Sequence, residues 1–199
     1  MVIIIDFNDS FTFNIAEVVY REVSQKLKVI PYSDIAQYQD EILSPERKVI
    51  ILGPGPGKAQ DYSEIYPYLK AWLKLDQIFL VGICLGHQML WDILGYPTVN
   101  LAKPIHGVAF KLRLNQRWKR LLKAPVEQMM VQHYNSLMVQ MPSEKTEISI
   151  ANKQYFLGFN EGVFCMSSAK SFLTYQFHPE SIGTTYPSVF FTPLKEFFV

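Results

Sequence analysis

The chain has 199 residues, of which 49% are hydrophobic and 19% are charged, and its formal net charge is +1. This length and balance are typical of a globular protein and predict a single domain over residues 1–199. The near-neutral charge argues against binding through a strong electrostatic field, so neither nucleic acid nor a membrane is expected as a partner.

The two cysteines, Cys84 and Cys165, are too few for a disulfide framework and point to a reducing compartment. The apolar run at residues 1–5 is far shorter than a signal sequence, and no apolar stretch approaches the roughly 18–20 residues that span a bilayer. We therefore expect a cytoplasmic protein. Histidine and cysteine do not occur at zinc-ligand spacing, so no metal is expected.

Strand and helix patterns alternate through the first half of the chain. Short apolar runs predict strands at 2–6, 27–31, 49–53 and 78–83, and helical patterns occupy 8–23, 62–74 and 86–94. Alternation of this kind predicts right-handed βαβ units and a parallel sheet that is covered by helices on both faces.

The second half of the chain has a different pattern. Residues 107–114 alternate apolar and polar side chains, and short strand-like runs follow at 127–134, 146–152, 162–168 and 172–177. These runs predict hairpins and antiparallel pairing. A terminal helix is predicted at 189–198, with Pro193 as a candidate break. The expected fold class is α/β, with a mostly parallel central sheet and a smaller antiparallel sheet.

Cys84 lies in the string Gly82-Ile83-Cys84-Leu85-Gly86, between a predicted strand and a predicted helix. This is the context of a nucleophile elbow, in which a sharp turn exposes the central residue and requires small neighbours two residues away. The free N–H groups at the start of the following helix would favour a thiolate. The alternative is an inert cysteine buried in the core, and the local pattern alone leaves both open.

A thiolate nucleophile needs a base, and the segment Gln176-Phe177-His178-Pro179-Glu180 offers one. Pro179 keeps His178 extended, so His178 and Glu180 should project to the same side and form a Cys-His-acid arrangement with Cys84. The alternative is a loop histidine beside a surface carboxylate. His87, His106 and His133 are more typical of structural positions.

The glycine- and proline-rich loop at 52–61 follows the third predicted strand. It lacks the spacing of a phosphate-binding loop, and an ordinary turn is the simplest alternative. Its position at the carboxyl end of a strand puts it on the same edge of the sheet as Cys84. A rigid backbone N–H from this loop, together with that of Leu85, would make an oxyanion hole.

Taken together, these segments resemble the class I, triad-type glutamine amidotransferases. The motifs "GICLGHQ" (82–88) and "FHPES" (177–181) look like the two catalytic motifs of that family. The closer likeness, to the small subunits of anthranilate synthase and aminodeoxychorismate synthase, depends on "IIIDFNDSFTFN" (3–14), "GPGPG" (53–57), "KPIHG" (103–107) and "HYNSL" (133–137). The resemblance implies the three-layer, flavodoxin-like fold of that family over the whole chain.

The resemblance also implies a reaction, the hydrolysis of glutamine to glutamate and ammonia without a cofactor. Cys84 would attack the side-chain amide, His178 would transfer protons, and Glu180 would orient His178. The N–H groups of Gly55 and Leu85 would hold the oxyanion.

Further roles follow from the same likeness. The residues implied in binding glutamine are Gly55, Pro56, Gly57, Gln88, Ser136 and Leu137. The ammonia would pass to a separate chorismate-binding large subunit of the synthase, and that partner would decide between a tryptophan and a folate pathway.

The sequence departs from the family pattern at Asn8, where a tyrosine is usual, at Val108, where a lysine is common, and at Asn135, where a histidine is common. Two alternatives therefore stay open beside the glutaminase subunit. One is a γ-glutamyl hydrolase on the same scaffold, and the other is a catalytically silent regulatory subunit.

Overall fold

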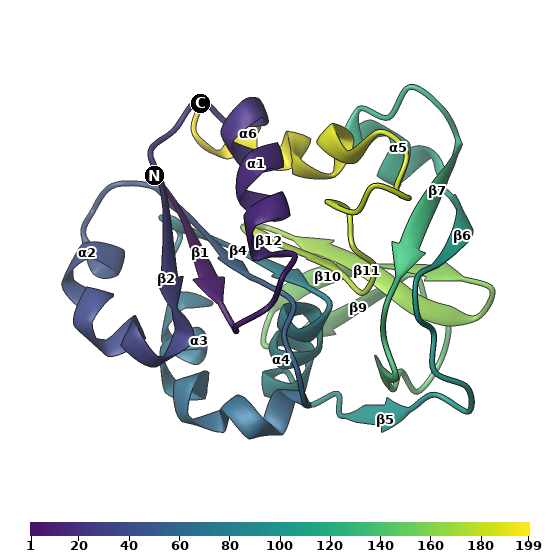
Figure 1. The fold of residues 1–199 in the computed structure, drawn as a ribbon, viewed down its shortest axis with the longest axis horizontal. Helices are drawn as coiled ribbons and strands as arrows, with labels where there is room; N and C mark the ends of the chain where they lie inside the picture. The colour runs from purple at the N-terminus through teal and green to yellow at the C-terminus, as the bar shows by residue number, and fades with distance from the viewer.

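A mixed eight-stranded sheet forms the centre of the computed structural model, which describes residues 1–199 (Figure 1). Its strand order is β2-β1-β3-β4-β12-β11-β10-β9. The parallel strands are β1 (Val2–Asp6), β2 (Leu27–Pro31), β3 (Lys48–Leu52), β4 (Ile78–Ile83) and β12 (Phe172–Tyr175). The antiparallel strands are β11 (Val163–Ala169), β10 (Lys153–Asn160) and β9 (Glu147–Ile150).

Two small antiparallel sheets accompany the large one. Strand β5 (Thr98–Asn100) pairs with β8 (Leu137–Val139), and β6 (Val108–Arg113) pairs with β7 (Gln128–His133). The predicted α/β fold class is confirmed, including hairpin pairing in the second half. Three of the hairpin strands extend the main sheet, because β12 returns to the centre and pairs in parallel with β4.

Helices cover both faces of the sheet. One face carries α1 (Thr12–Glu22), α5 (Gln116–Leu122), the 3₁₀ helix η3 (Pro187–Phe191) and α6 (Thr192–Phe197). The other carries the 3₁₀ helices η1 (Tyr32–Tyr38) and η2 (Ala59–Ile65), with α2 (Gln39–Leu43), α3 (Tyr66–Trp72) and α4 (Leu85–Ile93). None of these helices is long and apolar enough to cross a membrane.

Strand β1 explains how the two faces are filled. Val2 and Ile4 point into the core on the α1 face, whereas Ile3 and Ile5 point into the core on the α4 face. All four are fully buried. A strand that is buried on both sides must be apolar at every position, which is why the uniform run at 2–5 predicted a central parallel strand.

Two predicted helices differ from the structure. The segment predicted as a helix at 62–74 begins as η2, bends at Tyr62 (φ −112°, ψ 24°), and becomes α-helical only from Tyr66. The terminal segment is η3 followed by α6, and Pro193 lies in the first turn of α6. Proline suits that turn because its missing N–H would have no acceptor in the helix, so Pro193 begins a helix and does not divide one.

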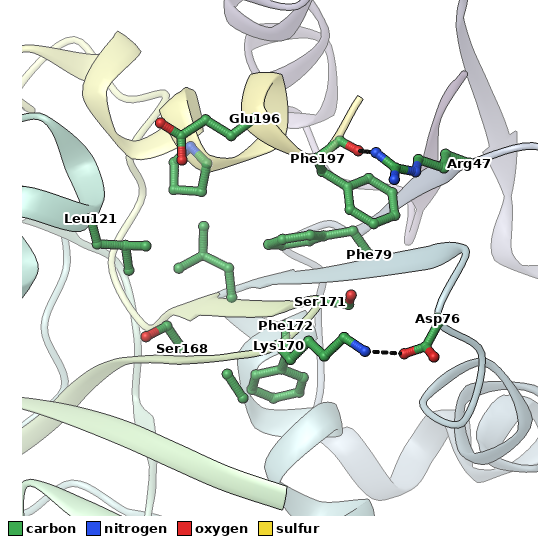
Figure 2. Close-up of a pocket in the computed structure, with 13 residues that line it drawn as sticks. Arg47, Asp76, Phe79, Leu121, Ser168, Lys170, Ser171, Phe172, Glu196 and Phe197 are labelled. Atoms are coloured by element: carbon green, nitrogen blue, oxygen red, sulfur yellow. Dashed lines mark hydrogen bonds and ion pairs between the residues drawn. The ribbon is translucent and has the colours of Figure 1, made fainter. Parts of the chain in front are cut away.

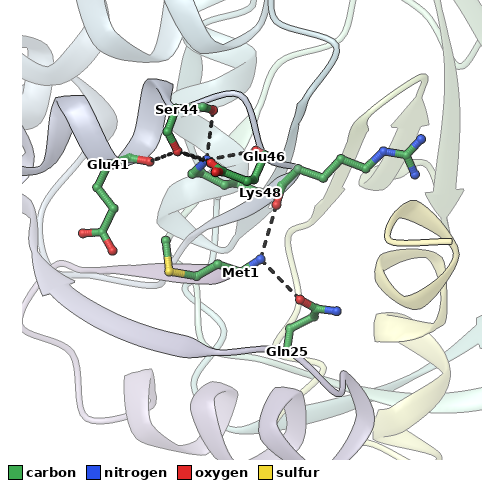
Figure 3. Close-up of polar contacts among 7 residues, drawn as sticks. Met1, Gln25, Glu41, Ser44, Glu46 and Lys48 are labelled. Carbon is green, nitrogen blue, oxygen red and sulfur yellow. Dashed lines mark hydrogen bonds and ion pairs between the residues drawn. The ribbon is translucent and has the colours of Figure 1, made fainter.

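Lys48, at the start of β3, is only 2% exposed (Figure 3). Its Nζ donates to the carbonyl oxygen of Ser44 at 3.0 Å, to Ser44 Oγ at 2.6 Å and to the carbonyl oxygen of Glu46 at 2.9 Å. A buried ammonium is tolerated only when its hydrogen-bonding capacity is used. Lys48 therefore fixes the turn that leads into β3, at the amino edge of the sheet.

Candidate active site

Cys84 stands on a sharp turn between β4 and α4, at the carboxyl edge of the sheet. Its backbone angles, φ 52° and ψ −102°, are strained for a residue with a side chain. Two backbone hydrogen bonds of Cys84 stabilise this turn. The N–H of Cys84 donates to the carbonyl oxygen of Tyr175 at 2.8 Å, and its carbonyl oxygen accepts from the N–H of Gln88 at 3.1 Å.

The glycines that flank Cys84 are required by close backbone contacts. A Cβ at Gly82 would lie 2.6 Å from the carbonyl of Gly86, and a Cβ at Gly86 would collide with the carbonyl oxygen of Leu52. Neither neighbour is a flexible side chain that could move away. The Gly-x-Cys-x-Gly spacing is therefore the steric condition for this turn, as the sequence predicted.

His178 and Glu180 lie in the segment that follows β12, which is the strand beside β4. His178 Nδ1 is 2.7 Å from Glu180 Oε1, and the side chains are 3% and 0% exposed. Since a carboxylate oxygen can only accept, Nδ1 carries the proton of this hydrogen bond. The other ring nitrogen, Nε2, is buried and has no partner within the protein.

The charges around His178 favour its protonated form. Burial by itself disfavours the charged imidazolium, but the negative charges of Cys84 and Glu180 outweigh burial and raise the pKa of His178 well above its ordinary value. These charges raise the pKa of His178 to about 10, so the ring is protonated at pH 7 and presents a cation to Cys84.

The loop after β3 lies directly against the Cys84 turn. A Cβ on Gly55 would be 2.6 Å from Leu85 Cδ2 and 2.6 Å from Phe7 Cβ, so Gly55 and Leu85 are close neighbours. The Tyr62 hydroxyl donates to the carbonyl oxygen of Pro56 at 3.0 Å and fixes the loop. Gly55 N–H makes no hydrogen bond within the protein, and the N–H of Leu85, in the first turn of α4, has no helical acceptor.

A cavity of about 210 Å³ opens beside these groups. It is smaller than the roughly 300–1,000 Å³ that drug-sized ligands need, and it suits a molecule the size of an amino acid. Ten residues line it: Gly55, Pro56, Gly57, Cys84, Leu85, Gln88, Tyr134, Asn135, Ser136 and Leu137. Apart from Cys84, Tyr134 and Asn135, these are the residues that the resemblance implied in substrate or oxyanion binding.

The hydrogen bonds of Leu137 limit how this residue can contact a ligand. The carbonyl oxygen of Leu137 already accepts from Gln88 Nε2 at 3.1 Å and from Asn135 Nδ2 at 2.9 Å. A carbonyl oxygen has two lone pairs, so this atom is saturated. A ligand in the cavity is left with other polar atoms, among them Gln88 Oε1, which makes no hydrogen bond within the protein.

The structure adds three residues that the sequence analysis did not place in the site. The rings of Phe11 and Tyr134 flank the His178 ring, with centroids 4.9 and 5.0 Å away. Gln176, which is fully buried, has its Nε2 3.8 Å from Cys84 Sγ. A polar residue inside the apolar run at 172–177 was the one signal in the sequence that could have identified Gln176.

The remaining histidines and the second cysteine lie outside this arrangement. Burial lowers the pKa of His87 to about 3 and that of His133 to about 4, so both are neutral at pH 7. His106 is exposed. Cys165 is buried, and burial raises the pKa of its thiol to about 12, as expected for a cysteine that fills the core.

A larger cavity of about 490 Å³ lies at the opposite edge of the sheet, beneath α6 (Figure 2). Its charged side chains already have partners: Lys170 Nζ is 2.8 Å from Asp76 Oδ1, and Arg47 Nη1 donates to the carbonyl oxygen of Phe197 at 2.6 Å. None of the candidate residues lines it. Size alone therefore does not identify the site, and the smaller cavity beside Cys84 has the reactive groups.

Comparison with known proteins covers almost the whole chain. Residues 3–197 match the family described as glutamine amidotransferase class-I. A protein of Pseudomonas aeruginosa described as "Anthranilate synthase component 2, pyocyanine specific" is 30% identical over 188 residues, which cover 92% of this chain and 86% of the relative. The aminodeoxychorismate synthase of Saccharomyces cerevisiae is 28% identical over 90% of this chain, but the match covers only 25% of that longer protein.

Among solved structures, a glutamine amidotransferase of Thermotoga maritima superposes with a TM-score of 0.68. The superposition covers 90% of this chain and 75% of the other, at 16% sequence identity. At that identity the likeness establishes the fold and nothing more.

Proposed function

Because the chain belongs to the class I glutamine amidotransferase family, we propose that it is the glutaminase subunit of a chorismate-aminating synthase. It would hydrolyse L-glutamine to glutamate and ammonia in the cytoplasm, as one amidotransferase domain over residues 1–199. The observation that carries the proposal is the geometry at Cys84, where a strained elbow, a buried His178–Glu180 pair and a small polar cavity meet.

In the first half of the proposed reaction, the thiolate of Cys84 attacks the carbon of the glutamine side-chain amide. The N–H groups of Gly55 and Leu85 donate to the oxyanion that forms, which is the interaction that stabilises such intermediates most. The imidazolium of His178 gives its Nε2 proton to the leaving nitrogen. The C–N bond breaks, ammonia departs, and a thioester remains on Cys84.

In the second half, His178 is neutral at Nε2 and takes a proton from a water molecule as that water attacks the thioester. The C–S bond breaks, glutamate leaves, and the thiolate–imidazolium pair is restored. Glu180 keeps the proton on Nδ1 throughout, so that Nε2 is the atom that exchanges protons in both steps.

The relatives support the partner in this proposal. One relative is named as component 2 of anthranilate synthase, and another is an aminodeoxychorismate synthase about four times as long as the segment it shares with this chain. The proposed partner is a separate chorismate-binding large subunit that consumes the ammonia.

Ammonia and glutamate release from L-glutamine by the purified chain, alone and with the chorismate-binding subunit and chorismate, tests the proposal. Cys84→Ala should abolish both products. Cys165→Ala is the matched control, because it removes the other thiol at a position that faces the core, and it should keep the activity wherever it folds. Equal product release by wild type and Cys84→Ala would refute the role of Cys84.

The same assay separates the two alternatives. A γ-glutamyl hydrolase would turn over a γ-glutamyl dipeptide faster than glutamine. A silent regulatory subunit would release no ammonia, and a glutamine-like electrophile would not label Cys84 even with the partner present. The proposal requires glutamine to be the better substrate and Cys84 to be labelled.

A further inference from the structure

Gln176 lies two residues before His178, in the segment that connects β12 to the candidate site. It is fully buried, and its backbone N–H donates to the carbonyl oxygen of Cys165 at 2.8 Å. Its side chain points toward Cys84, with Nε2 3.8 Å from Sγ. A carboxamide buried in apolar surroundings is costly unless both of its ends are hydrogen-bonded.

The other end of this carboxamide is held by Gln88, which lies one helical turn after Cys84. Gln88 Nε2 donates to Gln176 Oε1 at 3.1 Å and to the carbonyl oxygen of Leu137 at 3.1 Å. The three side-chain and backbone groups thus form a continuous chain of hydrogen bonds from Leu137 to the sulfur of Cys84.

The direction of every hydrogen bond in this chain is fixed from its far end. The carbonyl oxygen of Leu137 can only accept, so the Gln88 atom facing it must be the nitrogen. That nitrogen can only donate, so the Gln176 atom facing it must be the oxygen. The nitrogen of Gln176 is then the atom that faces Cys84, and Sγ can only be the acceptor of its N–H.

We propose that Gln176 is a positioning residue that stabilises the thiolate of Cys84 and that Gln88 holds it in the donating orientation. The inference rests on the proposed function in that it takes Cys84 as the nucleophile. A thiolate gains more from an N–H donor than a neutral thiol does, because hydrogen bonds to charged acceptors are stronger. Gln88 then has two roles, since it also lines the cavity for the substrate.

The other titratable groups near Cys84 do not make such a hydrogen-bond donor unnecessary. His178 is the one cation there, with Glu180 hydrogen-bonded to its far side. On α4, His87 is neutral and hydrogen-bonded to Thr174, and on β7, His133 is neutral and hydrogen-bonded to Asn135. His178 thus acts on the sulfur through its charge, and Gln176 lies at hydrogen-bond distance from it.

The test is the pH at which Cys84 becomes reactive. The rate of alkylation by iodoacetamide is followed by mass spectrometry of the Cys84 peptide between pH 5 and pH 10 at about half-unit steps. Gln176→Met removes the donor at similar length, and Gln176→Glu places a negative charge beside the sulfur. Gln116→Met is the matched control, because it makes the same exchange at an exposed position of α5.

The midpoint of the alkylation profile should move up by about one pH unit in Gln176→Met and further in Gln176→Glu, and it should stay in place in Gln116→Met. Turnover of glutamine by Gln176→Met should show a lower kcat with little change in KM. Gln88→Met should move the midpoint in the same direction and raise KM as well, because it frees Gln176 and alters the cavity.

An unmoved midpoint in folded Gln176→Met overturns the inference. If that variant does not fold, the midpoint of Gln88→Met decides, since this change leaves the sulfur and Gln176 intact. Alkylation does not depend on glutamine turnover. A chain without glutaminase activity would therefore refute the proposed function and still report on Gln176, and an active chain with an unmoved midpoint would refute Gln176 alone.

Discussion

Replacing Gly55 by alanine tests whether the loop after β3 supplies an oxyanion donor. The added Cβ would lie 2.6 Å from Leu85 Cδ2 and 2.6 Å from Phe7 Cβ, whereas ordinary contacts of such atoms lie at 3.4–4 Å. The Leu85 methyl group is the end of a side chain, but Phe7 Cβ is attached to the backbone of a fully buried residue and cannot easily move. The loop must therefore shift outward by about 1 Å.

The size of the effect follows from that shift. Overpacking of this kind costs about 1–3 kcal/mol of stability. A displacement of about 1 Å in a group that positions the reacting atoms costs about 10²-fold in rate, which is also the lower end of what the loss of one oxyanion donor costs. We expect Gly55→Ala to lower kcat about 10²-fold, with a much smaller change in KM.

Steady-state glutaminase kinetics and thermal melts measure both effects. Gly95→Ala is the matched control, because Gly95 has φ +94° and open space around it, so alanine costs about 1–2 kcal/mol in backbone strain without touching the site. Gly95→Ala should lose stability and keep its kcat. A folded Gly55→Ala variant with wild-type kcat would refute the role assigned to the Gly55 N–H.

Three further predictions concern charged and buried groups. Glu180→Gln removes a negative charge that helps to raise the pKa of His178. The alkaline limb of the kcat/KM profile should therefore move to lower pH by about one unit. An unmoved limb would show that Glu180 does not influence the pKa of His178. Burial lowers the pKa of His87 to about 3 in the folded protein, whereas the unfolded chain has the ordinary value of about 6.5. As the pH falls below 6.5 the unfolded chain binds this proton first, so the free energy of unfolding decreases, by about 2 kcal/mol at pH 5. Urea melts at pH 7.5 and pH 5 should therefore show a smaller loss for His87→Gln than for wild type, and equal losses would contradict the argument. Lys48→Met should cost about 1–3 kcal/mol in the same melts, because two carbonyl oxygens lose their donor, while kcat stays unchanged at the distant site; a fall in kcat would mean that the two edges of the sheet are coupled.

Much of the fold was predictable because its signals are local. The bounds of β1, β2 and β4 agree with the predicted strands. For β1 and β4 the reason is that an apolar run of five or six residues suits a strand buried on both faces, whereas β2 is a half-exposed edge strand. The weaker segments were missed. Helix α5 has seven residues, strands β5 and β8 have three each, and such short elements depend on tertiary contacts more than on their own periodicity.

The sequence by itself determined the reactive turn. A turn this sharp leaves no space for a side chain at positions 82 and 86, and both of these positions, which are only two residues from Cys84, are glycine. It also determined the His178–Glu180 pair, whose members are two residues apart in the chain, although the structure joins them by a turn and not by the extended segment that was expected. Only the tertiary structure decided what surrounds the sulfur. Gln176 is 92 residues from Cys84 in the chain, and the two meet because β12 pairs in parallel with β4. No local pattern encodes such a contact, since pairing of distant strands is set by how the whole sheet buries its two faces.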